Sequence, residues 1–591
     1  MGYLEHCYDV AESFRIKSYC LNPLALRHAS EAPGEAERLM EASQRLALES
    51  EDAVARALAL GAHMRLDWAI RLPEEALRSS GEALSAIEVL RDRQAAGSSA
   101  QAGLFSMWSD DYAWLSGRLL EEAGRGLERD RAVREAFRVS ERRRARALLS
   151  WLRRTESDAA EGAGPEFAGL EEVREALAPD EALLSFQVAP WEDVAGEFGG
   201  GSWLLAVTRD RVTVHRLPDR IEVRRDVAFF EGLIARRDGS EAGPGVHLYR
   251  KFLSPALEEL PPSVERLVLV PDDALHTLAF AALRPGPDAE PLGHRFELVR
   301  VPSATFWLRW LRSGSPGDRP SPRRSVLVLA DPELPRPEGD EAADSGPVQV
   351  AEVRGVGDRL GRLPHARREG RAAVRALGGG VLLSGLEASE AALRGFDLGG
   401  IGLLHFAAHA VADEDRPERS AILLAAGGAH DGLLQSAEIA ALDLRGCAVV
   451  LASCRSASGT VLRGEGVMSV GRAFFQAGAH SVIASLWPLR DDESAAQFRR
   501  FYRHLARGLT VAEALHAARR EAIDRGEPAA AWAGLVLLGN GDVAPAPEAL
   551  GRRPDLRLRV LLVSAGVVLL AVAVIFVRRR KMGTRAVGER P

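Results

Sequence analysis

This 591-residue chain has few cysteines and few lysines, and it has no excess of positive charge. Its four cysteines are too few for a disulfide framework at this length, which predicts a protein of a reducing compartment. Positive charge comes almost entirely from arginine, which we attribute to GC-rich coding rather than to function. The formal net charge of −7 is unlike that of a protein with a basic nucleic-acid-binding surface, so we expect no nucleic-acid partner.

Signatures of bound cofactors are also missing. The glycine-rich stretches 199–202 and 378–380 lack the lysine and the spacing of a phosphate-binding loop. His405 and His409 have the spacing of a zinc-binding pair on a helix, but in a strand they lie about 13 Å apart. No glutamate follows His405, as one does in that zinc motif. We therefore expect neither a metal nor an organic cofactor.

The N-terminal part, residues 1–157, is predicted to be all helical. The whole chain of 591 residues is too long for one core and is expected to form roughly two to four domains. In this part apolar residues recur at helical spacing, with breaks at Pro33, Pro73 and 97–99. Paired helices of this kind favour a helical-repeat array with a concave protein-binding face. No clean repeat of about 34 residues aligns, so a plain helical bundle stays open as the alternative.

After a linker at 158–179, short apolar runs alternate with helical segments over residues 180–543. This alternation predicts an α/β domain whose mostly parallel sheet is covered on both faces. The candidate strands are the apolar runs at 183–189, 203–208, 212–217, 266–271, 325–330, 380–385, 401–406, 421–426, 447–453 and 481–487.

Two helices of this α/β domain have recognisable first residues. Asp491 or Asp492 is expected to cap a helix that runs to about Ala506. Thr510 with Glu513 forms the pattern of a capping box for the helix that follows. Both features belong to the scaffold, and we assign no chemistry to them.

The C-terminal part contains an uncharged apolar run, Val560–Val577, that just reaches the length needed to cross a bilayer. We therefore expect a linker at 544–557, a transmembrane helix at 558–578 and a basic tail at 579–591. Arginines flank the run on both sides, which leaves its orientation open. Because the first residues show no secretory leader, the prediction is a single-pass C-terminal membrane anchor with the catalytic domain in the cytoplasm.

Two reactive side chains follow neighbouring predicted strands. His409 comes just after the run at 401–406, and Cys454 follows the run at 447–453. The carboxyl ends of parallel strands meet at one edge of a sheet, so we expect both side chains to face one crevice. A thiol beside an imidazole can lose its proton to it, and the thiolate is the form that attacks a carbonyl carbon. The pattern predicts nucleophilic catalysis by a Cys/His pair.

Four stretches carry a resemblance to a known family. They are VERLVLVPDDALHTLAFAAL at 264–283, LLHFAAHA at 403–410, VVLASCRSASGTVLRGEGVMSVGRAFFQAGAHSVIASLW at 449–487 and FYRHLARGLTVAEALHAAR at 501–519. From about residue 180 to 540 the chain resembles the CHAT domain, a bacterial caspase-like cysteine-peptidase family of clan CD that is often joined to tetratricopeptide (TPR) repeats. The resemblance implies a caspase-like α/β fold of two related halves, with the active half at about 320–540, and a TPR-like N-terminal region.

The same resemblance implies roles for individual residues. His409 matches the general base of the family and Cys454 its nucleophile, while the backbone N–H groups of Ala410 and Cys454 match its oxyanion site. The family usually has glycine where this chain has Ala410. If that position requires a positive φ, alanine costs about 1–2 kcal/mol there, which would lower activity. The candidate substrate-binding residues around the motif are Ser453, Arg455, Glu465 and Trp487.

The leading hypothesis is a membrane-tethered cysteine endopeptidase that cleaves a protein substrate through His409 and Cys454. The helical region is expected to bind a regulatory protein partner, and the C-terminal helix is expected to hold the protein at the membrane. The alternative is a catalytically inactive, membrane-associated scaffold that uses the helical region and the CHAT domain for protein contacts. Cys447 and His405 lie inside apolar runs and are expected to be structural.

Overall fold

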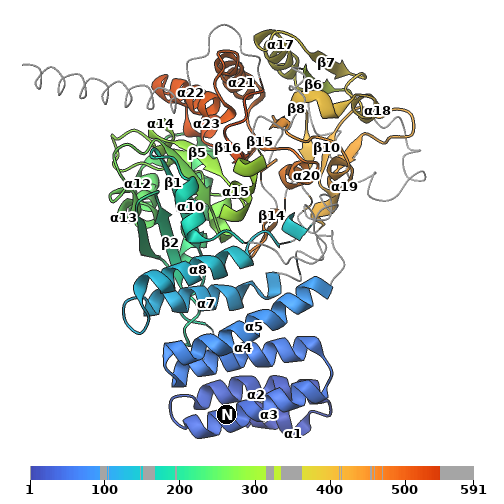
Figure 1. Cartoon of the computed structure of the whole chain (residues 1–591). Helices are drawn as coiled ribbons and strands as arrows, with labels where there is room; N and C mark the ends of the chain where they lie inside the picture. Colours follow the sequence, from blue (N-terminus) through green and yellow to red (C-terminus); the bar gives the residue numbers. More distant parts are fainter. Residues whose placement is uncertain are drawn as a thin grey trace, which may run out of the picture.

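Helices form the whole of the described N-terminal part. The structure, a computed structural model, describes residues 2–93, 103, 106–146, 148–150, 167–193, 196–313, 325–334, 362–411, 413, 416–452, 456–457, 460–468 and 470–545. The N-terminal helices are α1 (Gly2–Val10), α2 (Phe14–His28), α3 (Pro33–Glu49), α4 (Ala53–Ile70), α5 (Pro73–Arg93), α7 (Ser109–Glu122) and α8 (Arg129–Arg143). Consecutive helices pack on each other, α2 on α3, α4 on α5 and α7 on α8. We call this part the helical region. Figure 1 shows α1–α5 at one end of the molecule, with α7 and α8 between them and the sheet.

Local sequence explains how these helices start and pack. Asp52 caps α4 by accepting hydrogen bonds from the N–H groups of Val54 (2.8 Å) and Ala55 (3.2 Å). Ala55 and Ala59 are almost completely buried, and alanines at such positions allow neighbouring helices to approach closely. The all-helical N-terminal part that the sequence predicts is therefore present.

A disulfide bond between Cys7 and Cys20 joins α1 to α2. The two Cα atoms lie 5.9 Å apart, within the usual range for a disulfide. The number of cysteines predicted no disulfide framework and a reducing compartment, and it did not predict this single bond. A low cysteine count excludes a disulfide framework, but it does not exclude a single bond between two cysteines that adjacent helices bring together.

Eleven strands of the described chain form one sheet. Its order is β3-β2-β1-β4-β5-β16-β15-β12-β8-β6-β7. The strands in chain order are β1 (Glu181–Gln187), β2 (Ser202–Val207), β3 (Val212–Leu217), β4 (Arg266–Val270), β5 (Glu297–Arg300), β6 (Ser325–Pro332), β7 (Val381–Gly385), β8 (Ile401–Ala407), β12 (Ala448–Leu451), β15 (Ser481–Ser485) and β16 (Leu535–Gly539). Most neighbours are parallel, and the antiparallel pairs are β1–β2, β2–β3 and β15–β16.

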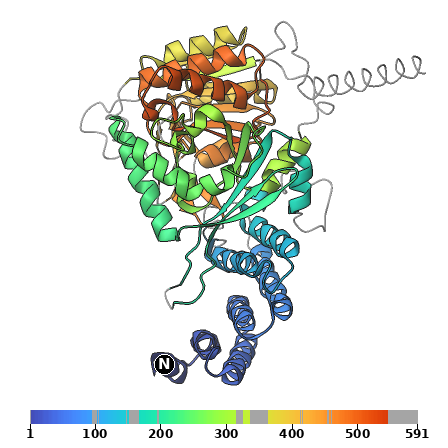
Figure 2. The ribbon, with the colours of Figure 1, turned by 90° about the vertical axis from the view of Figure 1, so that its left-hand side faces the viewer.

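The antiparallel pair β15–β16 divides the sheet into two halves. On one side β1, β4, β5 and β16 run in one direction, and on the other β15, β12, β8, β6 and β7 run in the opposite direction. We call β1–β5 the first half and β6–β15 the active half, and β16 lies between them, parallel to β5 and antiparallel to β15. Because the halves are antiparallel, their carboxyl-terminal strand ends lie at different edges of the sheet. Figures 1 and 2 both place the active half away from helices α1–α5.

Both faces of the central sheet are covered. Every residue of β2, β8, β12 and β15 is buried, although successive side chains point to opposite faces. In the active half, α17 packs over β6 and β8 and against α21, while α20 contacts β15. The helices after the helical region are α10 (Leu170–Ala176), α11 (Arg220–Arg236), α12 (Ala242–Phe252), α13 (Ser254–Leu257), α14 (Leu292–Arg295), α15 (Ala304–Ser313), α17 (Ala366–Ala376), α18 (Glu390–Arg394), α19 (Ser436–Ala440), α20 (Val470–Gln476), α21 (Asp491–Leu505), α22 (Val511–Asp524) and α23 (Ala529–Trp532).

Short strands lie outside the main sheet. The run predicted at 421–426 forms β10 (Ala421–Leu423), which pairs with β9 (Ala410–Val411) and β11 (Leu433–Gln435) in a small antiparallel sheet. A hairpin of β13 (Thr460–Leu462) and β14 (Gly466–Met468) follows the predicted nucleophile. Within the main sheet, β5 and β16 are additions that the sequence patterns did not reveal.

One of the two predicted helix starts is correct. Thr510 caps α22 and forms a capping box with Glu513, whose carboxylate accepts from the Thr510 N–H over 2.8 Å. The other prediction is wrong, because α21 begins at Asp491 itself and the residue at its N-cap is Arg490. The Asp491 carboxylate instead accepts a hydrogen bond from the N–H of His365 over 2.8 Å.

The predicted transmembrane helix and the predicted single-pass membrane localisation are both unsupported. Among the described residues, no helix combines the length and the apolar composition that a membrane span requires. The run Val560–Val577 and the basic tail lie outside the described residues.

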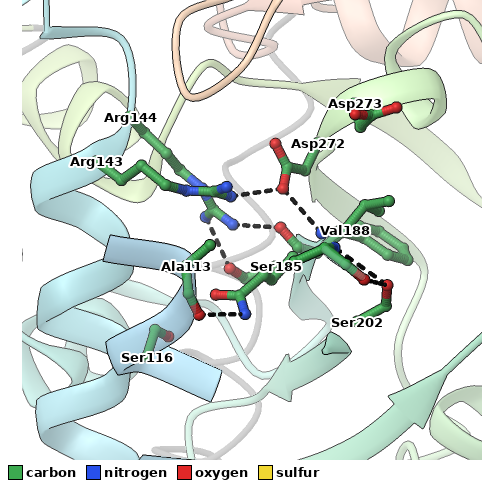
Figure 3. A network of polar contacts seen from close by, with 12 residues as sticks. Ala113, Ser116, Arg143, Arg144, Ser185, Val188, Ser202, Asp272 and Asp273 are labelled. Carbon is green, nitrogen blue, oxygen red and sulfur yellow. Dashed lines mark hydrogen bonds and ion pairs between the residues drawn. The ribbon is translucent and has the colours of Figure 1, made fainter. Parts of the chain in front are cut away.

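A buried network of charges joins the helical region to the first half (Figure 3). Arg143 at the end of α8 lies 2.5 Å from the Asp272 carboxylate, which follows β4. That carboxylate also accepts from the N–H of Val188. Arg144 donates to the Ser185 hydroxyl over 2.8 Å. Because these charges are buried and paired, the end of α8 is fixed to the carboxyl-terminal edge of the first half.

Candidate active site

The strands β8 and β12, which precede the two predicted reactive residues, are direct neighbours. They pair in parallel, with His405 opposite Val450 and Phe406 opposite Leu451. The N–H of Ala452 donates to the carbonyl of Phe406 over 2.9 Å, so the pairing continues past the end of β12. The segments that follow both strands therefore start side by side at one edge of the sheet.

His409 lies two residues beyond the end of β8. Its carbonyl accepts a hydrogen bond from the N–H of Leu423 over 2.8 Å, which holds this position against β10. The His409 side chain is half-buried and lines a small pocket of about 30 Å³ at the strand ends. Ala407, Ala408 and Ala452 form a wall of small residues in the same pocket.

Cys454 lies outside the described residues, together with Ser453 and Arg455. Hydrogen bonds hold the described residues on both sides of this segment. Ala452 lies beside Phe406, and Ser456 is buried where its hydroxyl accepts from the N–H of Ser485 over 3.0 Å. The roles predicted for these three residues stay predictions.

Ala410 occupies an ordinary extended conformation. It lies in β9 opposite Ile422 and is not among the residues with positive φ. The hydrogen bond from Leu423 to the carbonyl of His409 makes Ala410 and Ile422 a non-hydrogen-bonded pair of the ladder. The N–H of Ala410 consequently points away from β10. Alanine therefore causes no backbone strain here, which removes the physical objection to its replacing glycine.

The charges in the pocket beside His409 are carboxylates. Glu369 of α17 and Asp491 of α21 both line it, together with Ser494. No arginine or lysine is found among the described residues of its lining. Asp491 forms no ion pair with any described residue, and its described partner is the N–H of His365. The pocket therefore has an acidic wall opposite the small residues that follow β8 and β12.

A third carboxylate at this edge is already paired with arginines. Asp331 lies near the end of β6, one residue after Ala330, which pairs with Ala407. It is buried and has a φ of 47°. Its carboxylate accepts hydrogen bonds from Nε and Nη2 of Arg362 over 3.0 and 2.7 Å. Arg367 lies 3.0 Å away on the other side. Although burial alone raises its pKa, these arginines hold the pKa of Asp331 below its usual value.

A comparison with protein families decides the relationship of the chain. The CHAT domain matches residues 243–540, about half of the chain. The chain belongs to the CHAT domain family. The strands β8 and β12, the hairpin β13–β14 and helices α20 to α22 all fall within the matched residues.

Curated relatives of this CHAT domain protein share only part of their length with it. Human tetratricopeptide repeat protein 28 is 25% identical over 309 residues, which cover 48% of this chain and 12% of the relative. The mouse protein of the same name is 24% identical over 316 residues, with the same coverage. The chain thus spans about an eighth of the length of the curated relatives it matches.

Two solved structures show a limited similarity to this chain. The separase–securin complex of Saccharomyces cerevisiae is 11% identical, covers 91% of this chain and 48% of that chain, and has a TM-score of 0.41. The complex of pro- and mature domains of RgpB from Porphyromonas gingivalis is 9% identical, covers 51% of this chain and 69% of that chain, and has a TM-score of 0.32. Likenesses at this level carry no conclusion about function.

A buried polar cluster lies beneath the pocket of the CHAT domain. His405, which is completely buried in β8, has its Nδ1 atom 2.6 Å from the Tyr502 hydroxyl and its Nε2 atom 2.8 Å from Glu369. Burial and the nearby Glu369 raise the pKa of Tyr502 well above its usual value. The expectation that His405 is structural agrees with this position. It links β8 to both α17 and α21.

Sequence reasoning missed Glu369. It belongs to the charged run at 367–371, whose composition favours a solvated helix face. The structure buries Glu369 and Gly370 together with Ala366 and Ala373 on one side of α17. The spacing of those two alanines is the signal that marks the buried side of this helix.

Two candidate substrate-binding residues have other partners. Glu465 is buried and pairs with Arg472 over 3.0 Å. Trp487 donates from Nε1 to the carbonyl of Ala530 over 2.9 Å, and its ring lies against Gly534. Neither lines the pocket of His409. Cys447, expected to be inert, is buried in the core, and burial raises the pKa of its thiol to about 12.

Metal ligands do not gather in the described part of the chain. No group of three or more histidine, cysteine, aspartate and glutamate side chains there could hold a metal ion. The described polar side chains that line the pocket at the strand ends are those of His409, Glu369, Asp491 and Ser494.

Proposed function

We propose that the protein is a cysteine endopeptidase whose nucleophile is Cys454 and whose general base is His409. The observation that supports this most strongly is the parallel pairing of β8 and β12 up to Ala452. Cys454 is two residues from Ala452, and two residues of chain reach no further than about 7 Å. His409 is two residues from the end of the neighbouring strand. This connectivity supports the proposal that both side chains lie near one edge of the sheet.

The proposed reaction follows from these groups. The His409 imidazole accepts the thiol proton, and the Cys454 thiolate attacks the carbonyl carbon of a peptide bond. The tetrahedral intermediate collapses to an acyl-enzyme as the imidazolium gives its proton to the leaving amine. Water then attacks the thioester, with His409 again as base, and releases the carboxylic acid and the free thiol. No cofactor is consumed in either half of the reaction.

The oxyanion site we propose consists of the N–H groups of Ala410 and Cys454. The N–H of Ala410 suits this role because it points away from β10 and is not used in that ladder. Each such donor typically contributes about 3–4 kcal/mol to the transition state of acyl transfer. The alanine side chain does not alter this, because the donor belongs to the backbone.

The substrate we propose is a protein segment with a basic side chain next to the scissile bond. Asp491 and Glu369 line the pocket beside His409, and Glu369 is already close to His405. Asp491 is therefore the carboxylate left to receive a cationic side chain. A charge-assisted hydrogen bond of this kind contributes about 1.5–3 kcal/mol.

A protein partner on the helical region remains part of the proposal. Exposed large apolar side chains are concentrated there, including Phe14, Leu48 and Leu72. Where such side chains gather into a patch, they are typical of protein-binding surfaces. The rival function is an inactive scaffold that uses the same surface without catalysis.

Thiol labelling of the full chain tests the proposal without requiring the physiological substrate. Iodoacetamide is expected to label the wild-type protein under non-reducing conditions and to lose this reaction in Cys454→Ala. Cys447→Ala is the matched control and keeps the labelling, because Cys447 is buried and unreactive. His409→Ala is expected to slow labelling at neutral pH. Labelling that is unaffected by His409→Ala contradicts the dyad and favours the scaffold.

Peptide cleavage completes the test. A peptide library is expected to be cut by the wild-type chain and not by Cys454→Ala, with a preference for arginine or lysine before the cut. A cleavage that persists in Cys454→Ala rules out this residue as the nucleophile.

A further inference from the structure

The hairpin that follows Cys454 is held from three sides. It begins at Thr460, six residues after the predicted nucleophile, and ends at Met468, just before α20. Between its strands the turn carries Arg463, Gly464 and Glu465. Each of these three residues contacts a different element, so the turn is a junction rather than a free loop.

The first set of contacts comes from the helical region. Arg463 forms an ion pair with Asp110 in the first turn of α7. The carbonyl of Gly464 accepts a hydrogen bond from the N–H of Ala145 over 2.7 Å, just after α8. The contact is close: a Cβ atom on Gly464 would lie 2.9 Å from the Arg143 carbonyl oxygen. Gly464 also has a φ of 73°, which favours glycine.

The second and third sets come from the two halves of the sheet. Glu465 pairs with Arg472 of α20 in the active half, and Arg472 also donates to the Glu465 carbonyl over 2.8 Å. Gly466 lies against His276 of the first half, where a Cβ atom would approach the imidazole Cε1 to 3.2 Å. The hairpin therefore touches the helical region, the first half and the active half at once.

Buried contacts tie the helical side of this junction to the first half of the sheet. Arg143, whose carbonyl meets Gly464, is the residue that pairs with buried Asp272 (Figure 3). The same α8 terminus is tied to β1 by Arg144. A turn held against such a support has a defined position. If the helical region moved, the contact with Gly464 would move with it.

We infer that the helical region positions the nucleophile through this hairpin, with Asp110, Arg463 and Gly464 as positioning residues. The inference rests on the proposed function and adds the means by which a partner on the helices reaches the active half. Upstream, Ser456 and Ala457 anchor the chain on Ser485. Downstream, the hairpin provides the second anchor. Misplacing a reacting group by about 1 Å can cost about a hundredfold in rate, so loosening one anchor is enough to affect catalysis.

A double-mutant cycle on the full chain tests this inference. The variants are Asp110→Asn, Arg463→Gln and the combination of both. Two rates are measured for each: alkylation of Cys454 by iodoacetamide, and kcat and KM for a peptide substrate. Each single variant is expected to lower kcat about tenfold with little change in KM. Asp110 also pairs with Arg220 of α11 over 3.6 Å. The combination is therefore expected to be no worse than Asp110→Asn, the variant that loses both of these contacts.

The matched control is another ion pair of the same helix. Glu121, at the other end of α7, pairs with Arg216 of β3 over 3.1 Å and does not touch the hairpin. Arg216→Gln breaks a contact between the helical region and the first half, and it is expected to leave both rates unchanged. Equal losses in Arg216→Gln and Arg463→Gln would show a general loosening and contradict a specific role of the hairpin.

The two readouts separate this inference from the proposed function. A wild-type chain that cleaves no peptide, while Arg463→Gln still changes the alkylation rate, keeps the positioning role and contradicts the peptidase. A chain that cleaves peptides with unchanged kcat and alkylation rate in Arg463→Gln contradicts the positioning role alone. Thermal unfolding of every variant accompanies the rates, and a loss of kcat without a matching shift in Tm supports positioning over mere stability.

Discussion

The two halves of the sheet use the carboxyl ends of their strands in different ways. In the first half, β4 leads into Asp272, which is buried and paired with Arg143 of the helical region. In the active half, β8 and β12 lead into Ala408 and Ala452, which line a pocket with His409. We call the first of these the closed edge, because paired charges occupy the strand ends. We call the second the open edge, because small residues leave a pocket there. Charged residues at a strand end do not by themselves mark a site of chemistry.

The largest effect we predict confines the chemistry to the active half. Cys454→Ala or His409→Ala is expected to lower kcat/KM for peptide cleavage by about 10³-fold or more, because each removes one half of the dyad. The first-half variant Arg216→Gln serves as the control and is expected to keep full activity. Peptide cleavage assays measure both. An equal loss in the first-half variant would erase the functional difference between the halves.

The next effect concerns the closed edge. Asp272→Asn leaves Arg143 buried without its counter-charge, and it is expected to lower the free energy of unfolding by about 3–5 kcal/mol. Urea unfolding measures this change. Asp443→Asn is the control, because Asp443 pairs with Arg445 on the exposed surface and is expected to cost less than about 1 kcal/mol. Similar costs for the two variants would show that burial of the Arg143–Asp272 pair is unimportant.

Lowering the pH is expected to remove the stabilisation that the Asp272 carboxylate provides. Burial of Asp272 alone raises its pKa, but Arg143 and Arg144 outweigh it and hold the pKa below 3.8. The unfolded chain then binds a proton at a higher pH than the folded one. The stabilisation by this carboxylate is present above about pH 4 and is lost as the pH falls further.

The third prediction concerns His276, which contacts the hairpin from the first half. Burial lowers the pKa of His276 to about 4, whereas an unfolded histidine titrates near 6.5. Between these values only the unfolded chain binds the proton, so stability falls with the pH from 6.5 to 4, by up to about 3 kcal/mol. His276→Gln is expected to flatten this dependence by one proton. An unchanged slope in urea unfolding between pH 4 and 6.5 would contradict a neutral buried imidazole.

The smallest effect sharpens the description of the open edge. Asp491→Asn is expected to lower kcat/KM about tenfold for peptides with arginine or lysine before the cut, and to leave neutral peptides unchanged. Asp492→Asn is the control, because Asp492 is exposed and pairs with Arg490 over 3.3 Å. A uniform loss for basic and neutral peptides would assign Asp491 to the start of α21 rather than to the substrate.

The parts of the fold that depend on local chemistry could be predicted from the sequence. The apolar runs that form β8, β12 and β15 are recognisable because buried parallel strands are hydrophobic throughout. Thr510 and Glu513 mark the start of α22 because a capping box needs only neighbours in the chain. The strand β5 is not predicted from the sequence, because its four residues include the charged Glu297 and Arg300. These charges are accommodated by Arg266 and by backbone carbonyls that only the folded chain supplies.

The residues of the candidate site likewise fall into those that local sequence predicts and those that depend on tertiary packing. The placement of His409 after a strand was predictable, since it follows from the order of elements. Asp491 was read as a helix cap, and its hydrogen bond to His365 joins segments far apart in the sequence. Glu369 and the contacts of Gly464 likewise depend on tertiary packing. Nothing in a single sequence brings such distant residues together. Cys7 and Cys20 are only 13 residues apart, but their pairing depends on how α1 packs on α2.

The opposite directions of the two halves have a consequence for simultaneous binding. The helical region attaches where the strands of the first half end, whereas His409 lies where the strands of the active half end. A regulator seated on α1–α5 and a polypeptide bound beside His409 would occupy different surfaces and need not compete. Control of such an enzyme would then appear as a change in turnover rather than as exclusion of substrate, even for a bulky folded target.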